Sequence, residues 1–473
     1  MFPAKKYFIK KIIRILLLII LLCVVYIAGG IILSYKRQPA VSQKYKDSFH
    51  VSDYYSDSAS CDRAYIIEDN EEALLQRLRM IEQARDRIIL STFEFRADES
   101  GKDMLAALLA AAKRDVSIKV IADGIPAFIK IERNEYFYAL AAMENVEIKI
   151  YNRFNPSTPW KLMGRLHDKY LIADKDLYLL GGRNTYDFFL GNHGYKNYDR
   201  DVLVYTTDPD SKESSIHQLE DYFESVWELK ESTPFKARNT KKTSAARKEL
   251  GERYERIKKE YPTLAEKTDY AGMTFEVRKI TLLSNPMHVY SKEPMLFYSL
   301  AEIMKHSEGD IFIHTPYIIC NDWMYQCFQE ICEINPDTVL MTNSAANNGN
   351  PFGASDYLLH KDRLVDTGLT IYEYEGGVSY HGKSISVGDR LAIVGSFNMD
   401  MRSVYLDTEL MLVIDSEAVN RQLRENMEMY EASATRVTDK ENYMIPENVK
   451  QQELSTASKW KINILKIFNW FRF

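Results

Sequence analysis

The chain has 473 residues, of which 46% are hydrophobic and 27% charged, a composition typical of a folded globular protein with the length of two domains of about 100–200 residues each. Lys and Arg total 61 against 67 for Asp and Glu, a net charge of −6, which disfavours a protein that coats nucleic acid, because such binding depends on basic residues that neutralise phosphates. The five cysteines form no CxxC pair and no zinc-like spacing with histidine, so neither a redox motif nor a structural metal site is predicted.

The N-terminal part of the sequence predicts a membrane anchor. From Ile15 to Leu33 it runs for nineteen residues without a charge, close to the ~20 residues that cross a bilayer as a helix. We therefore predict a transmembrane helix over residues 12–34, preceded by a basic segment, 1–11. A cleavable signal peptide is the alternative, but its apolar region usually has only ~7–15 residues, and no small-residue cleavage site follows this run.

The basic residues around the anchor bear on its orientation. Five Lys and Arg residues precede the apolar run and two follow it directly. Because cytoplasmic flanks are usually the more basic, we expect a single-pass protein of the cell membrane with a cytoplasmic N-terminus and a catalytic body outside. Lys44 and Lys46 lie near enough to the span to weaken this asymmetry, so the sidedness stays open.

The remainder of the chain is a tandem of two similar halves. After a linker, 35–65, the first half, 66–230, begins with an apolar-periodic helix that leads into the strand RIILSTFEF. The second half, 273–435, begins with a helix that leads into DIFIHTPYI. Each half then has another helix-like stretch and a strand that ends near a tyrosine, Tyr151 or Tyr372. Strands that alternate with helices predict an α/β sandwich in each half.

Two further segments lie outside the halves. Residues 231–272 contain eleven basic and seven acidic residues and no apolar strand, which predicts a charged linker or a surface helix. The tail, 436–473, ends in a mixture of basic and aromatic residues typical of an amphipathic helix at a membrane interface, whereas a helix docked on the catalytic body is the alternative. The residues behind this prediction are Lys459, Trp460, Lys461, Lys466, Phe468, Trp470, Phe471, Arg472 and Phe473.

One short motif occurs in both halves. His167 and His381 are 214 residues apart, and three further identical pairs have the same spacing: Lys169 and Lys383, Gly181 and Gly395, and Asn184 and Asn398. Four identities at one offset indicate a duplicated element. In each copy the histidine and lysine are two residues apart on a predicted strand, so both side chains emerge on one face. The next turn and strand bring the small residues and the asparagine back beside them, which predicts a hairpin.

These side chains suit a phosphodiester substrate. One imidazole can attack phosphorus and leave again while a second protonates the departing oxygen, so two histidines with different roles are needed. Ammonium groups and amides supply positive charge and donors where the phosphoryl oxygens become more negative. A single HxK is more readily explained as a structural accident, but the duplication favours catalysis.

At these residues the sequence resembles the phospholipase D superfamily, whose motif is HxKxxxxD followed by GG or GS and Asn. The first copy satisfies every position, with His167, Lys169, Asp174, Gly181, Gly182 and Asn184. The second copy departs at the acid and otherwise matches, with His381, Lys383, Gly395, Ser396 and Asn398. Gly388 stands where the acid is expected, and Asp389 follows one place later. A one-residue shift in a strand turns a side chain away, so a supporting acid is in doubt in this copy.

Within the superfamily the likeness is closer to bacterial cardiolipin synthases, especially the compact C type. It is carried by LHDKYLIADKDLYLLGGRN, by TNSAANNGNPFGASDYLLHKDRLVDTGLTIYEYEGG and by VGSFNMDMRSVYLDTELMLVIDSE, and it extends over about residues 65–435. The resemblance implies two pseudo-symmetric α/β sandwich halves that pack side by side and share one active site.

The resemblance also implies two-step phosphatidyl transfer, with no metal and no other cofactor. His167 would attack the phosphorus of a phospholipid, and His381 would protonate the leaving alcohol. A hydroxyl of phosphatidylglycerol, deprotonated by His381, would then attack to give cardiolipin. Phospholipids and the membrane are the expected partners, and no specific nucleic acid is expected.

The remaining motif residues receive supporting roles in this scheme. The two lysines and two asparagines would bind the phosphate, and Asp174 would orient its neighbours. Further candidates for a supporting role are Gly182, Ser396, Asp389 and Glu409. Asp201 and Arg402 are either pocket-wall residues or members of structural ion pairs.

Three other functions remain open from the sequence. If water attacks in the second step, the same site is a phospholipase. Some relatives with one N-terminal anchor cut nucleic acid, although the acidic balance and the synthase-like flanks disfavour a nuclease. An inactive membrane scaffold has Gly388 as its only support.

Overall fold

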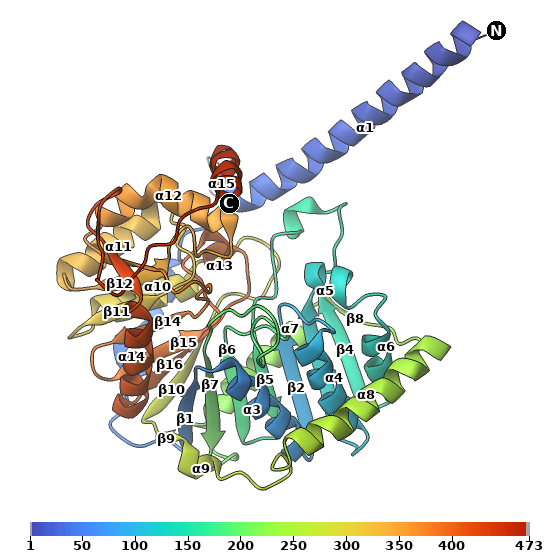
Figure 1. Cartoon of the computed structure of the whole chain (residues 1–473). Helices are drawn as coiled ribbons and strands as arrows, with labels where there is room; N and C mark the ends of the chain where they lie inside the picture. Colours follow the sequence, from blue (N-terminus) through green and yellow to red (C-terminus); the bar gives the residue numbers. More distant parts are fainter. Residues whose placement is uncertain (1, 470–473) are drawn as a thin grey trace.

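The computed structural model describes the backbone of residues 2–469 and the side chains of residues 7–466. The predicted aromatic and basic residues Trp470, Phe471, Arg472 and Phe473 lie outside the described residues, as does the side chain of Phe468. The chain forms two nine-stranded mixed sheets, one in each half, with helices packed around them (Figure 1). The predicted α/β fold with two halves is confirmed.

The first sheet has the strand order β8-β4-β3-β2-β5-β6-β7-β1-β9. Its strands are β1 (Asp62–Ile67), β2 (Arg87–Thr92), β3 (Ser117–Asp123), β4 (Val146–Tyr151), β5 (Tyr170–Ala173), β6 (Leu177–Gly181), β7 (Asp201–Thr206), β8 (Ser232–Pro234) and β9 (Phe275–Glu276). The helices of this half are α3 (Asn70–Gln83), α4 (Glu99–Ala112), α5 (Gly124–Lys130), α6 (Glu135–Ala141), the 3-10 helix η2 (Pro159–Lys161), α7 (Ser215–Trp227), α8 (Lys241–Glu260) and α9 (Tyr270–Met273).

The second sheet has the order β10-β16-β15-β14-β11-β12-β13-β17-β18. Its strands are β10 (Lys279–Ser284), β11 (Ile311–His314), β12 (Val339–Asn343), β13 (Thr370–Tyr374), β14 (Ser384–Val387), β15 (Leu391–Gly395), β16 (Leu410–Asp415), β17 (Ala434–Val437) and β18 (Tyr443–Met444). Its helices are α10 (Met295–Lys305), α11 (Asp322–Ile334), α12 (Pro351–Val365), α13 (Met401–Tyr405), α14 (Glu417–Glu431) and α15 (Thr456–Asn469).

The two sheets repeat one topology. β2, β3 and β4 are parallel neighbours, as are β11, β12 and β13. β5, β6, β7 and β1 continue the first sheet antiparallel from β2, and β14, β15, β16 and β10 continue the second sheet in the same way from β11. The parallel strands are joined through helices, as parallel pairing requires. The duplication predicted from the motif therefore extends over these seven neighbouring strands of each sheet.

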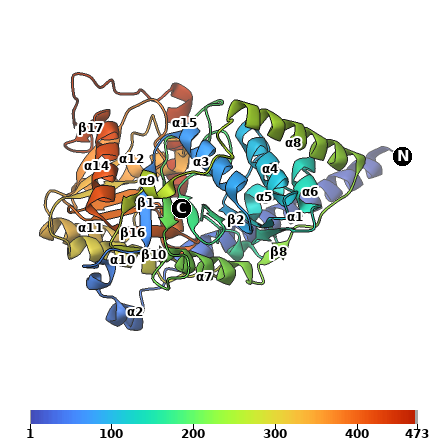
Figure 2. The ribbon, with the colours of Figure 1, turned by 90° about the horizontal axis from the view of Figure 1, so that it is seen from below.

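The core consists of separate layers, because both faces of each sheet are apolar. One face of the first sheet packs against α3, α4, α6 and α8, and one face of the second packs against α10, α11 and α12. The other faces share a core with α7 and α14 that includes Ile172 and Val202 from the first half and Val394 and Leu412 from the second. The halves consequently lie side by side with an apolar interface (Figure 2), which is what holds one half in register with the other.

Two glutamines repeat the symmetry at this interface. Gln422 of α14 accepts a hydrogen bond from the backbone N–H of Ile66 in β1 (2.9 Å) and donates one to the carbonyl of Ile66 (3.1 Å). Gln218 of α7 accepts from the N–H of Leu282 in β10 (2.9 Å) and donates to the carbonyl of Ile280 (3.1 Å). Each half thus places one helix against the edge-side strand of the other, and the polar backbone groups there are satisfied.

The element boundaries differ from the predicted segments at three places. β1 begins at Asp62, inside the predicted linker 35–65, and β9 of the first sheet lies within the predicted second half. β17 and β18 extend the second sheet past residue 435. The charged stretch 231–272 folds onto the first half, because α8 buries an apolar stripe, Ala246, Leu250, Tyr254 and Ile257, at helical spacing.

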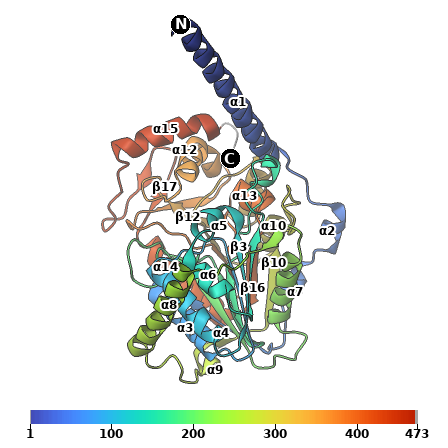
Figure 3. The same cartoon turned by 90° about the vertical axis from the view of Figure 1, so that its right-hand side faces the viewer.

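The first and last helices of the described residues lie on one side of the molecule. Helix α1 (Phe2–Lys36) projects away from the body, while α15 lies beside its base on top of α12 (Figure 3). Residues Tyr7–Lys36 are long and apolar enough to cross a membrane by length and composition. Between α1 and β1 lie α2 (Gln43–Ser48) and the short 3-10 helix η1 (Val51–Tyr54).

Candidate active site

The two motif hairpins adopt the same geometry. Tyr170 of β5 pairs with Leu180 of β6, and Ser384 of β14 pairs with Val394 of β15. The backbone N–H of Gly181 donates to the carbonyl of Lys169 (3.1 Å), and that of Gly395 donates to the carbonyl of Lys383 (3.3 Å). The glycine and asparagine of each motif are thereby returned beside the histidine and lysine, as the spacing predicts.

Each motif histidine is held by the other half of the chain. Leu166, directly before His167, forms a bridge with Thr408, directly before Glu409, and Tyr380, directly before His381, forms one with Tyr198. The N–H of His167 donates to the hydroxyl of Thr408 (3.1 Å), and the N–H of His381 donates to the carbonyl of Tyr198 (2.6 Å). The segment that carries each histidine is therefore hydrogen-bonded to the opposite half at the interface.

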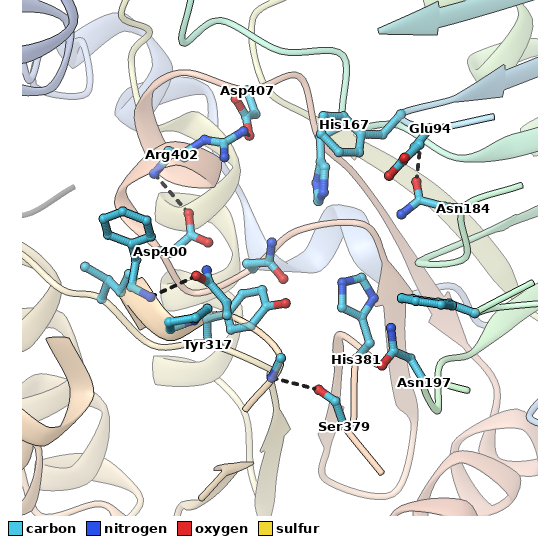
Figure 4. Close-up of a pocket in the computed structure, with 18 of the residues that line it drawn as sticks. Glu94, His167, Asn184, Asn197, Tyr317, Ser379, His381, Asp400, Arg402 and Asp407 are labelled. Atoms are coloured by element: carbon cyan, nitrogen blue, oxygen red, sulfur yellow. Dashed lines mark hydrogen bonds and ion pairs between the residues drawn. The ribbon is translucent and has the colours of Figure 1, made fainter. Parts of the chain in front are cut away.

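This arrangement pairs each imidazole with a carboxylate from the opposite half. Nδ1 of His167 lies 2.8 Å from Oε1 of Glu409, and Nδ1 of His381 lies 2.6 Å from Oδ2 of Asp199. With Nδ1 donating to a carboxylate, the tautomer leaves a lone pair on Nε2. In Figure 4 the rings of His167 and His381 lie opposite one another across the pocket. A phosphorus atom between them can be attacked from one side and lose its leaving group on the other.

The pKa of each of the two imidazoles is lowered. Burial, assisted by the neighbouring Lys383 and opposed by Asp199, lowers the pKa of His381 to about 4. Burial also lowers the pKa of His167, assisted by Lys169, so that this imidazole is neutral near pH 7 and free to act as a nucleophile.

The two carboxylates are shifted in opposite directions. Although burial acts to raise it, the pKa of Asp199 is lowered to about 2 because Lys383 and His381 stabilise its charge. Burial raises the pKa of Glu409 to about 8 against the opposing effect of Lys169. Asp199 is thus the stronger counter-charge, and carboxylates with separated pKa values often mark separate acid and base roles.

Both motif lysines are buried next to their histidines. The Nζ of Lys169 donates to the carbonyl of His167 at 2.5 Å, and Nζ of Lys383 donates to the carbonyl of His381 and lies 3.2 Å from Nε2 of the same residue. Burial lowers the pKa of Lys169 to about 7 and that of Lys383 to about 8. A bound phosphate would favour the charged form of both, because an anion stabilises an ammonium group.

The two asparagines line the same pocket as the histidines. Oδ1 of Asn184 accepts the backbone N–H of Glu94 at 3.3 Å, which directs the amide N–H₂ away from that contact. Oδ1 of Asn398 is buried and has no hydrogen-bond partner among the described residues. Both amides are placed where they can donate to a phosphoryl oxygen.

The small residues of the motifs make room for the carboxylates. A Cβ atom on Gly182 would lie 2.2 Å from Oδ1 of Asp199, so a side chain there would displace this acid. In the second copy Ser396 occupies the corresponding position and donates to Oε2 of Glu409, while Ser403 donates to Oε1 of the same carboxylate (2.6 Å). The supporting candidates therefore lie beside the two imidazole–carboxylate pairs: Gly182 is next to Asp199, the partner of His381, and Ser396 is next to Glu409, the partner of His167.

Asp174 lies elsewhere than the motif suggests. It follows β5 with φ of +54°, at the hairpin turn, and its carboxylate accepts the backbone N–H groups of Arg85, Asp86 and Arg87 (2.8–3.2 Å). The prediction that Asp174 orients the catalytic side chains is corrected by these contacts: it fixes the start of β2.

The second copy explains why an acid is not needed at this position. Gly388 has φ of +53° and donates its N–H to the carbonyl of Asp310 (2.9 Å), as Asp174 does to Arg87 (2.9 Å). Glycine adopts this left-handed conformation without a steric cost. Asp389 lines a separate polar pocket with Arg390 and Arg421, so its predicted supporting role at the imidazoles is also corrected.

The carboxylate beside His381 was missed in the sequence. Of the two alternatives for Asp201, the structure shows the structural ion pair, with Arg183 (3.1 Å) and Arg77 (2.9 Å) in the core. Asp199, which the sequence did not single out, is the counterpart of Glu409. The two acids are hard to match in the sequence because Glu409 lies directly before β16 whereas Asp199 lies two residues before β7. The loop between Asn184 and Asp199 is also longer than that between Asn398 and Glu409.

The pocket between the halves has a volume of about 1020 Å³, the size of sites that hold drug-sized ligands or larger. Both histidines and both asparagines line it, together with Phe93, Phe189, Tyr317, Asp400, Arg402 and Asp407 (Figure 4). The ring of Phe93 packs edge-on to His167 with 5.2 Å between centroids, and Phe189 packs on His381 at 4.9 Å. The rings restrict each imidazole to one orientation.

One cluster in this pocket has the composition of a metal site. Ligand atoms of His167, Asp407 and Glu409 lie within 4.8 Å of one another. Asp407, however, forms an ion pair with Arg402 (3.0 Å), and Glu409 accepts hydrogen bonds from two serines and His167. These donors already satisfy the carboxylates, which fits an imidazole-positioning role better than a cation.

Comparison with known proteins identifies the family. The model of the family described as "Cardiolipin synthase, PLD-like domain" matches residues 78–227 and 300–430, one segment in each half. Cardiolipin synthase C of Escherichia coli is 24% identical over 395 residues, which cover 75% of this chain and 81% of that protein. A cardiolipin synthase of Clostridium perfringens is 25% identical over 401 residues, 83% of this chain and 75% of that protein. An uncharacterised protein of Helicobacter pylori is 24% identical over 404 residues, 76% of this chain and 78% of that protein.

A solved structure has the same fold. The crystal structure of phosphatidylserine synthase from Haemophilus influenzae superposes with a TM-score of 0.61 at 16% identity and covers 86% of this chain and 92% of that one. The match over most of both molecules agrees with the duplicated architecture, and the family model matches both motif-bearing halves. The chain therefore belongs to the cardiolipin synthase, phospholipase D-like domain family, within the phosphatidyltransferase branch of the phospholipase D superfamily.

Proposed function

We propose that this protein is a membrane-anchored cardiolipin synthase that transfers a phosphatidyl group from one phosphatidylglycerol molecule to another. The observation that carries the proposal is the opposed pair of imidazoles, each bonded through Nδ1 to a carboxylate of the other half. The cardiolipin synthases among the relatives supply the substrate class. The N-terminal helix would anchor the protein in the cell membrane, and the basic flank favours a cytoplasmic N-terminus.

In the first step Nε2 of His167 attacks the phosphorus of the donor lipid. The bond from phosphorus to the glycerol head-group oxygen breaks, and His381 gives that oxygen its proton, which leaves phosphatidylglycerol's head group as free glycerol. In the free protein burial lowers the pKa of His381 to about 4, so this step requires that Asp199, the stronger counter-charge, and the bound phosphate together stabilise its imidazolium form. The product of this step is a phosphatidyl group on His167.

In the second step a hydroxyl of the acceptor phosphatidylglycerol attacks the same phosphorus. His381, now neutral, accepts the hydroxyl proton, and the bond from phosphorus to His167 Nε2 breaks. One phosphodiester replaces another, so no nucleotide is consumed. Lys169, Lys383, Asn184 and Asn398 hold the phosphoryl oxygens through both steps, where the negative charge increases.

The test is conversion of phosphatidylglycerol by the purified full-length protein in nanodiscs. We expect cardiolipin and free glycerol in equal amounts, measured by mass spectrometry. His167→Ala and His381→Ala should lower the rate at least about 10²-fold, since each removes a group in direct contact with the reacting atoms. The matched control is His306→Ala, which removes a largely exposed histidine outside the pocket.

The products separate this proposal from its alternatives. Phosphatidic acid without cardiolipin would show that water is the acceptor and would overturn the transferase assignment. Release of nucleotides from single-stranded DNA, with no lipid product, would identify a nuclease. Equal activity of wild type and His167→Ala would show that this pocket is not the active site.

A further inference from the structure

The base of the anchoring helix is packed rigidly against the catalytic body. A Cβ atom at Gly30 would lie 2.5 Å from Cγ of Pro159, so the helix touches η2 there with no room for a larger residue. Ser34 donates to the carbonyl of Trp160 (2.9 Å), and Ser291 of the second half donates to the carbonyl of Ser34 (2.9 Å). Helix α1 thus enters the body as a continuous helix rather than through a flexible linker.

The length of α1 then determines where the body lies relative to a bilayer. The nineteen uncharged residues from Ile15 to Leu33 span about 28 Å at 1.5 Å per residue, against a hydrocarbon thickness of about 30 Å. The whole run is needed to cross, including residues from Gly30 onward that already contact the body. The surface of the body around η2 must therefore lie at the level of the lipid head groups.

The same end of α1 forms part of the catalytic pocket. Ile31 and Tyr35 line the cavity that contains His167 and His381, and Leu465 of the C-terminal helix α15 lines it as well. Tyr35 is only 5% exposed, so its ring is a fixed part of the wall. A residue of the anchor and a residue of the tail therefore both face the space where the substrate must bind.

Exposed apolar side chains surround this end of the molecule. Phe128 and Ile129 of α5, Phe352 of α12, and Trp460 and Ile464 of α15 are all exposed, and these helices lie on the side from which α1 leaves (Figures 1 and 3). Apolar residues grouped on one face mark an interaction surface. The ring of Tyr26 packs edge-on to Trp160 and its hydroxyl donates to the carbonyl of Ser157 (2.9 Å), in the manner of interfacial aromatic residues.

We infer that the catalytic pocket opens at the lipid–water interface beside the anchor, and that Ile31 and Tyr35 of α1 and Leu465 of α15 form the wall along which the acyl chains of a bound phospholipid extend into the bilayer. The anchor is then part of the substrate site and helps to select a lipid whose chains remain in the membrane. The occupant of the apolar face is the leaflet next to the body, because α1 continues directly from that face into the membrane.

The first test compares two substitutions on the anchor and rests on the proposed function for its readout. Ile31→Trp adds bulk to the pocket wall, whereas Leu22→Trp places the same ring on an exposed part of the helix. Full-length variants in nanodiscs receive long-chain phosphatidylglycerol, and in parallel a short-chain, water-dispersed phosphatidylglycerol. We expect Ile31→Trp to lower the turnover of the long-chain lipid at least about tenfold, because a misplaced reacting group costs rate steeply, with a much smaller effect on the short-chain lipid.

The readout is total phospholipid consumed, as cardiolipin plus phosphatidic acid. If only phosphatidic acid forms, the proposed transfer reaction fails but the comparison between the variants still tests the pocket wall. If Ile31→Trp behaves like Leu22→Trp with both substrates, the inference is overturned.

The second test does not depend on activity. A benzophenone amino acid is incorporated at position 352 in α12, or at position 429 in α14, where Met429 is also exposed but lies away from α1. The full-length protein is irradiated in phosphatidylglycerol nanodiscs, and lipid adducts are counted by mass spectrometry of peptides. We expect adducts at position 352 and almost none at position 429; equal labelling at both positions would contradict an interfacial pocket.

Discussion

At the scale of single residues, the two motif histidines differ mainly through their carboxylates. Asp199 retains its charge because Lys383 and His381 lie beside it, whereas burial raises the pKa of Glu409 to about 8. Burial lowers the pKa of both imidazoles in the free protein, so we propose that the stronger counter-charge makes His381 the one that becomes protonated when phosphate binds and leaves His167 as the neutral nucleophile. The identical HxK motifs do not distinguish them.

Substitution of the carboxylates tests this division of roles. Asp199→Asn removes the counter-charge of His381 and allows the wrong tautomer, so kcat should fall about 10²–10⁴-fold. Glu409→Gln should have a smaller effect, because Glu409 stabilises less charge. The rates come from steady-state turnover in nanodiscs, with the exposed Asp210→Asn as the matched control. A larger loss for Glu409→Gln than for Asp199→Asn would reverse the assignment.

The lowered pKa values of the two motif lysines predict how activity declines at alkaline pH. In the free protein the pKa of Lys169 is lowered to about 7 and that of Lys383 to about 8 by burial, so the ammonium forms that bind phosphate predominate below these values and are lost above them. We expect kcat/KM, which reports the free enzyme, to decline from about pH 7 upward. In kcat the decline should begin at a higher pH, because bound phosphate raises both pKa values. A kcat/KM that stays flat through pH 9 would contradict the role of these lysines.

At the scale of elements, the hairpin turn of each motif has a structural task that is separate from catalysis. Asp174 and Gly388 occupy equivalent left-handed positions. Asp174 caps backbone N–H groups before β2, whereas Gly388 fits beneath the carbonyl of Glu308, where a Cβ atom would approach to 2.5 Å. The acid of the HxKxxxxD motif is thus one of two ways to make the same turn.

Asp174→Ala should separate stability from catalysis. The substitution leaves the backbone N–H groups of residues 85–87 without their acceptor, a loss of about 1–3 kcal/mol in the free energy of unfolding, and it places alanine in a left-handed conformation. Asp174→Asn keeps an acceptor and tolerates this conformation, so it should lose less. Chemical denaturation measures the stability, and kcat of the folded variants should stay within about threefold of wild type. A large loss of kcat in a stable Asp174→Asn protein would restore a catalytic role for this residue.

At the scale of the whole molecule, the duplication places both motif histidines in one pocket. Each histidine is completed by a carboxylate from the other half, and the shared core with α7 and α14 fixes the two halves against each other. Neither half alone therefore contains a complete imidazole–carboxylate pair.

The stoichiometry of the covalent intermediate tests this conclusion. An activated phospholipid with a good leaving group needs no acid in the first step, so His381→Ala should accumulate a phosphatidyl adduct that it cannot pass on to an alcohol. We expect one adduct per chain by intact-protein mass spectrometry, mapped to His167, and none in His167→Ala. Two adducts per chain, or an adduct that persists in His167→Ala, would contradict a single shared site.

Much of this architecture could be predicted from local patterns. The alternation of strands and helices predicted the two α/β halves, and the 214-residue offset between His167 and His381 predicted a duplicated hairpin, because strand periodicity and turn residues act over a few neighbours in the chain. The apolar run to Leu33 predicted the long N-terminal helix for the same reason. The strands near the outer ends of the sheets, at 62–67, 275–276, 434–437 and 443–444, were missed because their pairing depends on strands far away in the chain.

By itself, the sequence determined the duplicated histidines, lysines and asparagines, the two sheets and the apolar helix. Only the tertiary structure decided that Asp199 and Glu409 bond to the histidine of the opposite half, that Asp174 belongs to a turn, and that Ile31 and Tyr35 of α1 line the same pocket as the two histidines. The physical reason is distance along the chain: local spacing determines which side chains share a hairpin, whereas contacts across about 200 residues depend on how two separate sheets pack around a common apolar core.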